Sequence, residues 1–379
     1  MKRIAVMIET SRAYGRALME GIAAHAQAAG DWRLRSLAND RLGAAGLREY
    51  DGVILRLADR RTAARILASG TPAVDVYGGG TPRIPVSDSD HRRIGALAAE
   101  FFLKRGFRSL AWCGIDGLGF SDRRGTAFCA AVASAGFTPL RYARPRRIRA
   151  DSSLFYDERL DRIPDADELA RWLGSLPRPT AVFCCHDYRA YQLMQVATDL
   201  GLGIPQDLSV LGVDNDTTLC SFAPIPLSSV DPDAFEVGRA AAAMLDGMMS
   251  GGRAPASAAC APRGIVERES TEFVPSGIPW LSAALLFIEK NHPRGISAAD
   301  VIAQTGRSPT FVERVFRKET GLSVQAHITR MRMNLAERLL ATTDLMVKEI
   351  AGRCGYRSAQ YFCRAFSATH HGRSPLSFR

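Results

Sequence analysis

Residues 308–316 read S-P-T-F-V-E-R-V-F, and residues 358–366 read S-A-Q-Y-F-C-R-A-F. Serine, arginine and phenylalanine recur at the same positions, fifty residues apart. Each copy follows a short apolar stretch that ends at a glycine, Gly306 before the first copy and Gly355 before the second. A helix, a glycine turn and a second helix with an arginine on its outer face make a helix-turn-helix. The repeat therefore predicts an all-α region with two helix-turn-helix units, whose second helices enter neighbouring major grooves of DNA.

The positive charge of the chain is concentrated around this repeat. The whole sequence carries a net charge of +10, and residues 280–379 contribute +8 of it, with 15 Lys and Arg against 7 Asp and Glu. A basic segment of this kind is typical of a domain that binds a polyanion. The alternative is a solvated basic surface, and the repeat in the same segment makes it the weaker interpretation. Double-stranded DNA is the expected partner.

Capping residues indicate where the C-terminal helices begin. Ser297 and Asp300 form an acidic variant of the capping box. Ser308 is expected to cap the next helix, and Pro309 occupies its first position, where the missing N–H costs nothing. Ser358 is expected to cap a helix over residues 359–369. Between the two units, a long helix over residues 323–342 is expected.

The residues on the outer faces of the two recognition helices are the candidate base readers. Arginine can grip O6 and N7 of guanine, and glutamine can pair with N6 and N7 of adenine. Glu313 accepts from cytosine N4, or it neutralises Arg317 one turn later, and the second interpretation is favoured. The outer-face residues differ between the units, so each subunit is expected to read an asymmetric site. The candidates are Thr310, Glu313, Arg314 and Arg317 in the first unit and Gln360, Tyr361 and Arg364 in the second, with Lys318, Arg332 and Arg357 as candidate phosphate contacts.

The first 275 residues alternate short apolar runs with stretches rich in alanine and leucine. This alternation predicts parallel strands joined by crossover helices, an α/β fold. One late helix is expected over residues 227–251. The predicted strands are 4–8, 53–57, 73–77, 110–113, 181–184 and 209–213, and the predicted helices are 17–29, 92–105, 124–135 and 188–200.

Polar residues follow these strands, and ligands of such sheets bind outside the carboxyl ends of the strands. Carboxylates accept hydrogen bonds from hydroxyls, arginine donates to them, and aromatic rings stack on the apolar face of a sugar. The set therefore predicts a sugar pocket, although Asp88 and Asp187 could instead be helix N-caps. The candidate ligand-binding residues are Arg12, Tyr14, Asp75, Asp88, Arg124, Asp187 and Asp214.

The two regions meet at residues 275–279, P-S-G-I-P. Two prolines and a glycine in five residues interrupt both helix and strand. The sequence therefore predicts an effector domain over residues 1–275 and a helical domain over residues 276–379. A basic run at residues 144–149 is expected to be a solvated loop.

Several classes of protein are disfavoured by what the sequence lacks. Its eight cysteines are scattered without a C-x-x-C pair, so neither a metal site nor a disulfide framework is expected. No signal peptide or membrane span is recognisable, which predicts a cytoplasmic protein. No G-x-S-x-G and no glycine-rich phosphate loop is present. We therefore expect neither an enzyme nor a cofactor.

Residues 3–272 resemble the periplasmic-binding-protein-like effector domain of lactose-repressor-type regulators. The resemblance is carried by residues 86–98, 184–187, 204–215 and 227–241, which read V-S-D-S-D-H-R-R-I-G-A-L-A, C-C-H-D, I-P-Q-D-L-S-V-L-G-V-D-N and L-S-S-V-D-P-D-A-F-E-V-G-R-A-A. It implies two lobes that close around a ligand by a hinge motion. By position, it places effector contacts on Asp88, Arg124, Asp187 and Asp214.

Residues 281–379 resemble the DNA-binding domains of the arabinose-regulator family, through G-Y-R-S-A-Q-Y-F-C-R-A-F at 355–366 and G-R-S-P at 372–375. That family's base contacts fall on Thr310, Arg314, Gln360 and Arg364. The order of the two domains resembles the regulators of xylose operons. The resemblance implies a homodimeric activator that works with RNA polymerase and responds to D-xylose or another pentose. A uronic acid effector, a repressor, and a sugar-binding protein whose C-terminal domain is an interaction module stay open.

Overall fold

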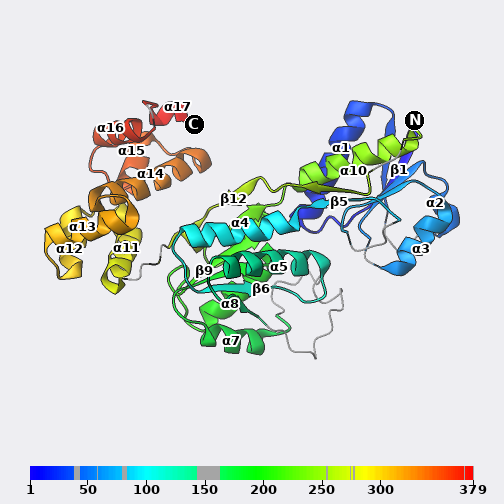
Figure 1. Ribbon diagram of the computed structural model, residues 1–379. Helices are drawn as coiled ribbons and strands as arrows, with labels where there is room; N and C mark the ends of the chain where they lie inside the picture. The colour runs from blue at the N-terminus through cyan, green and yellow to red at the C-terminus, as the bar shows by residue number, and fades with distance from the viewer. Residues whose placement is uncertain are drawn as a thin grey trace. The chain divides into compact units, whose positions relative to one another are not determined.

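The computed structural model describes residues 1–37, 43–57, 59–78, 83–142, 163–252, 255–273, 275, 278–370 and 372–378. They form two compact units, Met1–Glu272 and Phe273–Arg379 (Figure 1). The predicted boundary after residue 275 lies close to this division, and the basic run at 144–149 lies outside the described residues. Among the described helices, none has the length and apolarity that a membrane crossing requires.

The first unit begins with a lobe built on a parallel six-stranded sheet, ordered β11-β5-β4-β3-β1-β2. Alternate residues of β1 point to opposite faces, as strand geometry requires. Ile4 and Val6 pack against α1 and α10, and Ala5 and Met7 pack on the side of α2 and α3. The elements are β1 (Lys2–Met7), α1 (Ala13–Ala29), β2 (Trp32–Ser36), α2 (Ala44–Leu47), β3 (Gly52–Leu55), α3 (Arg60–Ser69), β4 (Ala73–Asp75), β5 (Val86–Ser89), α10 (Ala234–Met249) and β11 (Ser257–Cys260).

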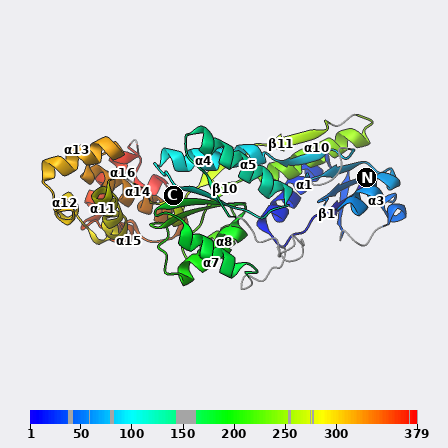
Figure 2. The ribbon, with the colours of Figure 1, turned by 60° about the horizontal axis from the view of Figure 1, so that its bottom comes forward.

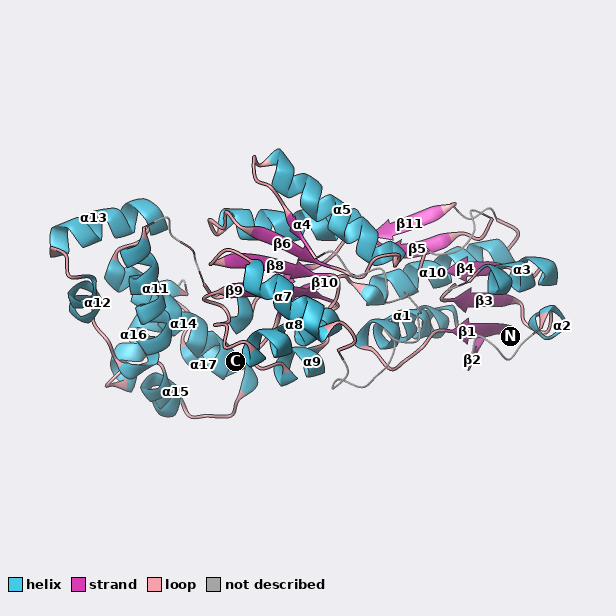
Figure 3. Cartoon of the chain, turned by 90° about the horizontal axis from the view of Figure 1, so that it is seen from below, coloured by secondary structure: helices cyan, strands magenta, loops and turns pink. Residues whose placement is uncertain are grey.

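The second lobe has a six-stranded sheet ordered β12-β10-β9-β8-β6-β7, in which only β12 is antiparallel to its neighbour. Helices α4 and α5 cover one face of this sheet, and α7 and α8 cover the other (Figure 3). The elements are α4 (His91–Lys104), β6 (Leu110–Cys113), α5 (Gly119–Ser134), β7 (Leu140–Arg141), α7 (Ala166–Ser175), β8 (Thr180–Cys184), α8 (Asp187–Asp199), β9 (Leu208–Val213), α9 (Thr217–Phe222), β10 (Ser228–Asp231) and β12 (Gly264–Val266).

The chain crosses between the lobes three times, from β5 to α4, from β10 to α10 and from β11 to β12. Hydrogen bonds tie the crossings together. The N–H of Asp90 donates to the carbonyl of Cys260 at 2.7 Å, and the N–H of Arg263 donates to Asp231 at 3.0 Å. The Asp233 carboxylate caps α10 and pairs with Arg263 at 2.9 Å. The predicted two-lobe α/β fold is therefore confirmed.

The expected helix over residues 227–251 is wrong at its beginning. Residues Ser228–Asp231 form the buried strand β10, and the helix begins only at Ala234. The strand is short and is followed at once by a crossing to the other lobe, so its apolar residues merge in the sequence with those of the helix. The polar strand β5, with the pattern Val-Ser-Asp-Ser, was missed because it lacks an apolar run.

The second unit is helical and has two small cores. Val312 and Phe316 lie in the first core, and Phe362 and Phe366 lie in the second. Helix α14 serves both, because Ile328 packs in the first and Leu340 in the second. The helices are α11 (Pro279–Asn291), α12 (Ala298–Thr305), α13 (Pro309–Thr320), α14 (Val324–Thr342), α15 (Val347–Arg353), α16 (Ala359–Thr369) and α17 (Pro375–Phe378).

The predicted caps of this unit are mostly as expected. The Ser297–Asp300 capping box is present, and the Ser358 hydroxyl accepts from the N–H of Tyr361. Ser308 occupies the N-cap position of α13, but its side chain makes no capping hydrogen bond. The expectation that this hydroxyl caps the helix is wrong.

Helices α1 and α10, which lie side by side on the first lobe, approach each other through two glycines (Figure 2). A Cβ added to Gly21 would lie 2.0 Å from the carbonyl oxygen of Phe235, and one added to Gly238 would lie 2.1 Å from the carbonyl oxygen of Leu18. Backbone atoms cannot move away as a flexible side chain can. The lobe therefore requires the absence of a side chain at both positions.

We predict that Gly21→Ala destabilises the first unit by roughly 1–3 kcal/mol or more, because the methyl group forces the two helices apart. Gly247→Ala is the matched control, since it lies in α10 with open space around it. There the alanine is expected to stabilise by up to about 1 kcal/mol. Thermal unfolding followed by circular dichroism measures both, and equal melting temperatures for the two variants would contradict the close helix contact.

Candidate functional site

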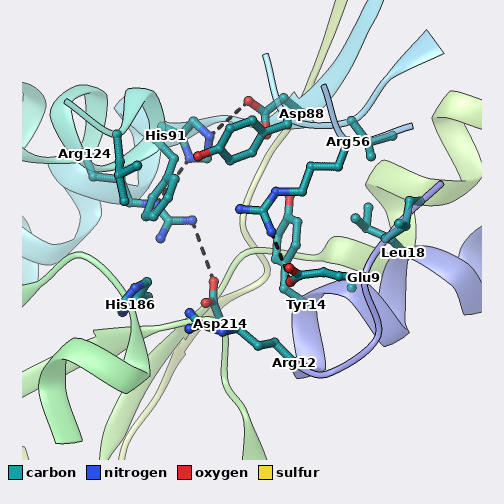
Figure 4. Close-up of a pocket in the computed structure, with 16 residues that line it drawn as sticks. Glu9, Arg12, Tyr14, Leu18, Arg56, Asp88, His91, Arg124, His186 and Asp214 are labelled. Atoms are coloured by element: carbon teal, nitrogen blue, oxygen red, sulfur yellow. Dashed lines mark hydrogen bonds and ion pairs between the residues drawn. The ribbon is translucent and has the colours of Figure 1, made fainter. Parts of the chain in front are cut away.

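A pocket of about 680 Å³ lies between the two lobes (Figure 4). Its walls come largely from loops that follow the carboxyl ends of strands in both sheets, where such folds bind ligands. The lining residues are Ile8, Glu9, Arg12, Tyr14, Gly15, Leu18, Arg56, Val76, Tyr77, Asp88, His91, Leu118, Phe120, Arg124, His186 and Asp214.

Arg124, in the first turns of α5, is the buried cation of this pocket. Its side chain donates to the carbonyl of Cys185 and, at 3.3 Å, to Nδ1 of His91. A third contact joins its Nη2 to Oδ1 of Asp214 at 3.8 Å. The guanidinium also lies 5.1 Å from the ring centroid of Phe120. Four neighbours therefore fix its position.

His91 carries the contact onward to Asp88. Since Nδ1 of His91 accepts from the arginine, its Nε2 carries the proton and donates to Oδ2 of Asp88 at 3.1 Å. Burial lowers the pKa of His91, which favours this neutral form. The same Asp88 oxygen pairs with Arg123 at 2.8 Å. The N-cap alternative for Asp88 is wrong, because it lies in β5 and Asp90 caps α4.

Asp214 follows β9 with a φ of 112°, in a region that residues with a side chain rarely adopt. Such strain is often retained where a side chain must be aimed at a ligand. Its N–H donates to the carbonyl of Val230 at 3.0 Å, which holds this loop on the sheet. Burial raises the pKa of Asp214 to about 6. The carboxylate is an acceptor above that pH and a donor below it.

Two residues of the predicted set, Arg12 and Tyr14, reach the pocket from the loop after β1 and the start of α1. The Tyr14 hydroxyl is 2.9 Å from the Ser89 hydroxyl, and burial raises the tyrosine's pKa, so it stays neutral. The Arg12 guanidinium lies 4.9 Å from the ring centroid of Tyr188, which belongs to the other lobe.

Asp75 and Asp187 do not line this pocket, contrary to expectation. Asp75 is fully buried, and it accepts from the N–H groups of Leu57, Tyr77 and Gly78 at 3.0–3.1 Å. Its carboxylate holds two loops together, and burial raises its pKa to about 6.

Asp187 accepts from the Ser229 hydroxyl at 2.6 Å and from the N–H of Asp216 at 2.8 Å. It therefore supports the loop that carries Asp214, and it borders only an outer pocket of the cleft. The N-cap alternative for Asp187 is also wrong, because His186 caps α8.

The seven sequence candidates leave out five charged or titratable lining residues, which are Glu9, Arg56, Tyr77, His91 and His186. Arg56 follows the buried strand β3, so the rule that selected the other candidates could have found it. It pairs with Glu9 at 3.0 Å and lies 4.3 Å from the ring centroid of Tyr77. His91 does not follow a predicted strand, because it is the first residue of a helix, so the same rule does not select it. The completed pocket alternates cations, acceptors and aromatic rings, a surface suited to a polyhydroxylated molecule.

The second candidate site is the outer face of α13 and α16. Thr310, Arg314 and Arg317 are exposed on α13, and Glu313 is half-buried with its carboxylate 3.7 Å from Nε of Arg317. This contact favours the interpretation that Glu313 neutralises Arg317.

On α16, Gln360, Tyr361 and Arg364 are exposed, with Tyr361 at 71%. The opposite faces of both helices carry the buried phenylalanines of the two cores. Each helix therefore presents an arginine and a hydrogen-bonding side chain to the outside.

Arg332 is not available as a phosphate contact. It is only 7% exposed, and its guanidinium donates to the carbonyls of His292 and Ile296 at 2.9 and 2.8 Å. Its position on α14 faces the turn between α11 and α12, whose carbonyls accept these hydrogen bonds. The expectation that it lies outside is therefore wrong.

Comparison with known proteins places both sites in context. A periplasmic binding protein-like domain model matches residues 99–271, and a helix-turn-helix domain model matches residues 301–379. The xylose operon regulatory protein of Escherichia coli strain K12 is 26% identical over 97% of this chain and 94% of its own. An HTH-type transcriptional activator of Providencia stuartii is 35% identical over 30% of this chain and 80% of its own. The solved structure of a xylose-binding transcription activator is similar with a TM-score of 0.73 and 25% identity, covering 100% of this chain and 97% of that one.

We predict that Arg332→Ala destabilises the second unit by about 1.5–3 kcal/mol, because the charged hydrogen bonds to two carbonyls are lost. Arg357→Ala is the control, since Arg357 is exposed, and a surface substitution is expected to change stability by less than about 0.5 kcal/mol. Urea unfolding of the full chain followed by far-UV circular dichroism, to which the helices of the second unit contribute, measures the difference. If Arg332→Ala instead left stability unchanged and lowered DNA affinity, Arg332 would be a surface contact.

Proposed function

This chain belongs to a family of helix-turn-helix transcription regulators that includes the xylose operon regulatory protein, and we propose that a pentose sugar controls its binding to DNA. Membership of this family makes the chain a DNA-binding regulator and not an enzyme. The alternative of a sugar-binding protein whose C-terminal domain is an interaction module therefore does not hold. D-xylose is the first candidate effector.

One observation carries the sugar proposal, the chain of contacts that runs Asp214–Arg124–His91–Asp88 around the pocket. It supplies alternating donors and acceptors in fixed positions. Tyr14, Tyr77 and Phe120 add aromatic surface. Such a site matches the hydroxyls and the apolar ring face of a sugar. Because residues of both lobes contribute, a bound sugar favours the closed arrangement of the lobes.

The regulator is proposed to act as a cytoplasmic homodimer and as an activator, in contact with RNA polymerase. Similarity to a structure named as a xylose-binding transcription activator supports activation. Sugar-driven closure would then change the spacing of the two DNA-binding units in a dimer. A repressor with the same parts is the second candidate, and the position of the operator relative to the promoter distinguishes the two.

The test of the sugar proposal uses the full chain. We expect D-xylose to stabilise it by about 2.7 kcal/mol when the free sugar is about a hundredfold above its Kd. A thermal-shift screen of pentoses, hexoses and uronic acids identifies the effector, and DNA affinity for the adjoining promoter is then measured with and without it. Arg124→Met should abolish the shift, because it removes the cation that organises the pocket. Sugars that bind without changing DNA affinity would contradict control by the effector.

The test of base reading uses Arg364. We predict that Arg364→Ala loses discrimination at one or two base pairs by roughly 1–3 kcal/mol, because its bidentate contact to guanine is removed. Lys318→Ala is the comparison, since a phosphate contact weakens binding to all sequences alike and lowers the salt dependence by about one unit of slope. Titration of a set of single-base operator variants measures both. A uniform loss for Arg364→Ala would assign it to phosphate instead.

A further inference from the structure

The cleft does not end at the pocket that holds Arg124. A second, outer pocket of about 1,060 Å³, open to solvent, adjoins it and shares Arg12, Tyr14 and Asp214 with it. These three residues therefore form the passage between an inner and an outer pocket. A group attached to a ligand in the inner pocket can extend into the outer one without leaving the cleft.

The outer pocket has an apolar wall formed by Leu219 and Phe222, and neither side chain takes part in the inner pocket. Phe222, at the end of α9, is 65% exposed, and it stacks on Tyr191 with centroids 6.1 Å apart and an interplanar angle of 24°. Leu219 lies one turn earlier on the same helix and lines the same pocket. A single exposed apolar residue is ordinary. Here, however, Phe222 stacks on the buried ring of Tyr191 and lies beside Leu219 in the wall of a pocket.

Arg16, in α1, faces this wall from the other lobe. The Arg16 guanidinium donates to the carbonyls of Thr10 and Ser11 at 3.1 and 2.8 Å and lies 3.9 Å from the Asp216 carboxylate. Its position is thus fixed at the rim of the pocket. The Asp216 carboxylate caps α9 and so lies on the same lobe as Phe222. An apolar platform opposed by a fixed donor, with a carboxylate on its own side, is a combination that recognises a sugar ring.

We infer that the outer pocket is a second sugar subsite, so that the effector is a disaccharide whose second ring lies on Phe222. This inference rests on the proposed function, because the first ring is taken to occupy the inner pocket. A pentose binds to the inner pocket alone, and a glycosidically linked second pentose adds the contacts of the outer one. The wall selects for the apolar face of a ring rather than for charge.

The test compares D-xylose with its β-1,4-linked disaccharide by titration calorimetry on the full chain. We expect the disaccharide to bind about tenfold more tightly, which corresponds to about 1.4 kcal/mol. Phe222→Ala should remove this advantage and leave the affinity for D-xylose unchanged, because Phe222 does not line the inner pocket. Phe222→Trp should preserve it. Leu200→Ala is the control, an exposed apolar residue of the same lobe that lines neither pocket.

The outcomes separate this inference from the proposed function. If D-xylose binds and the disaccharide binds more weakly, or if Phe222→Ala does not change the ratio of the two affinities, the second subsite is wrong and sugar control stands. If methyl β-D-xyloside binds as tightly as the disaccharide, the passage accepts a substituent but the outer wall recognises no ring, which also overturns the inference. If neither sugar binds, the proposed effector class fails together with the subsite.

Discussion

A single buried guanidinium organises the ligand site of the first unit. Arg124 is 2% exposed, and an arginine cannot lose its charge to escape burial. Its donors must therefore be met by acceptors, and removing one partner of a buried charge costs about 3–5 kcal/mol. The acceptors come from the ends of β8 and β9 and from the first residue of α4. The charge thus joins three loops of the second lobe at the place where the first lobe closes on it.

The carboxylates in and around the pocket have different roles, because each buried charge or donor needs a partner. Those that accept from backbone N–H groups, a serine or a thiol, as Asp75 and Asp187 do, shape the loops around the pocket. Those that meet a cation or an imidazole, as Asp88 and Asp214 do, face the pocket itself. Residues of the same type at equivalent places after strands therefore have two different roles, and their local partners decide which.

Much of this could be predicted from the sequence, and the failures have physical reasons. The strand at residues 110–113 and the helix at 359–369 have the predicted bounds, because an apolar run and a serine cap mark them locally. The predicted start of the helix at 227–251 was wrong because no local sequence pattern marks the point at which the chain crosses from one lobe to the other. The predictions for Arg332 and Asp75 failed because the sequence does not show whether a charged side chain forms its hydrogen bonds with water or with buried backbone groups. Pairing across the cleft, as between Arg12 and Tyr188, depends on contacts between residues far apart in the chain.

The close contact of α1 with α10 has a consequence for the order in which the protein can form during synthesis. The first lobe takes its strands β1–β5 from the beginning of the chain, but α10, which covers Ile4 and Val6 together with α1, ends only at Met249. The second lobe from α4 to β10, all but its edge strand β12, is made in between. On the ribosome, the lobe that emerges first must therefore wait with one face of its sheet only partly covered, by α1 alone, until the later lobe has been translated, and chaperones would meet the exposed part of that face in the nascent chain.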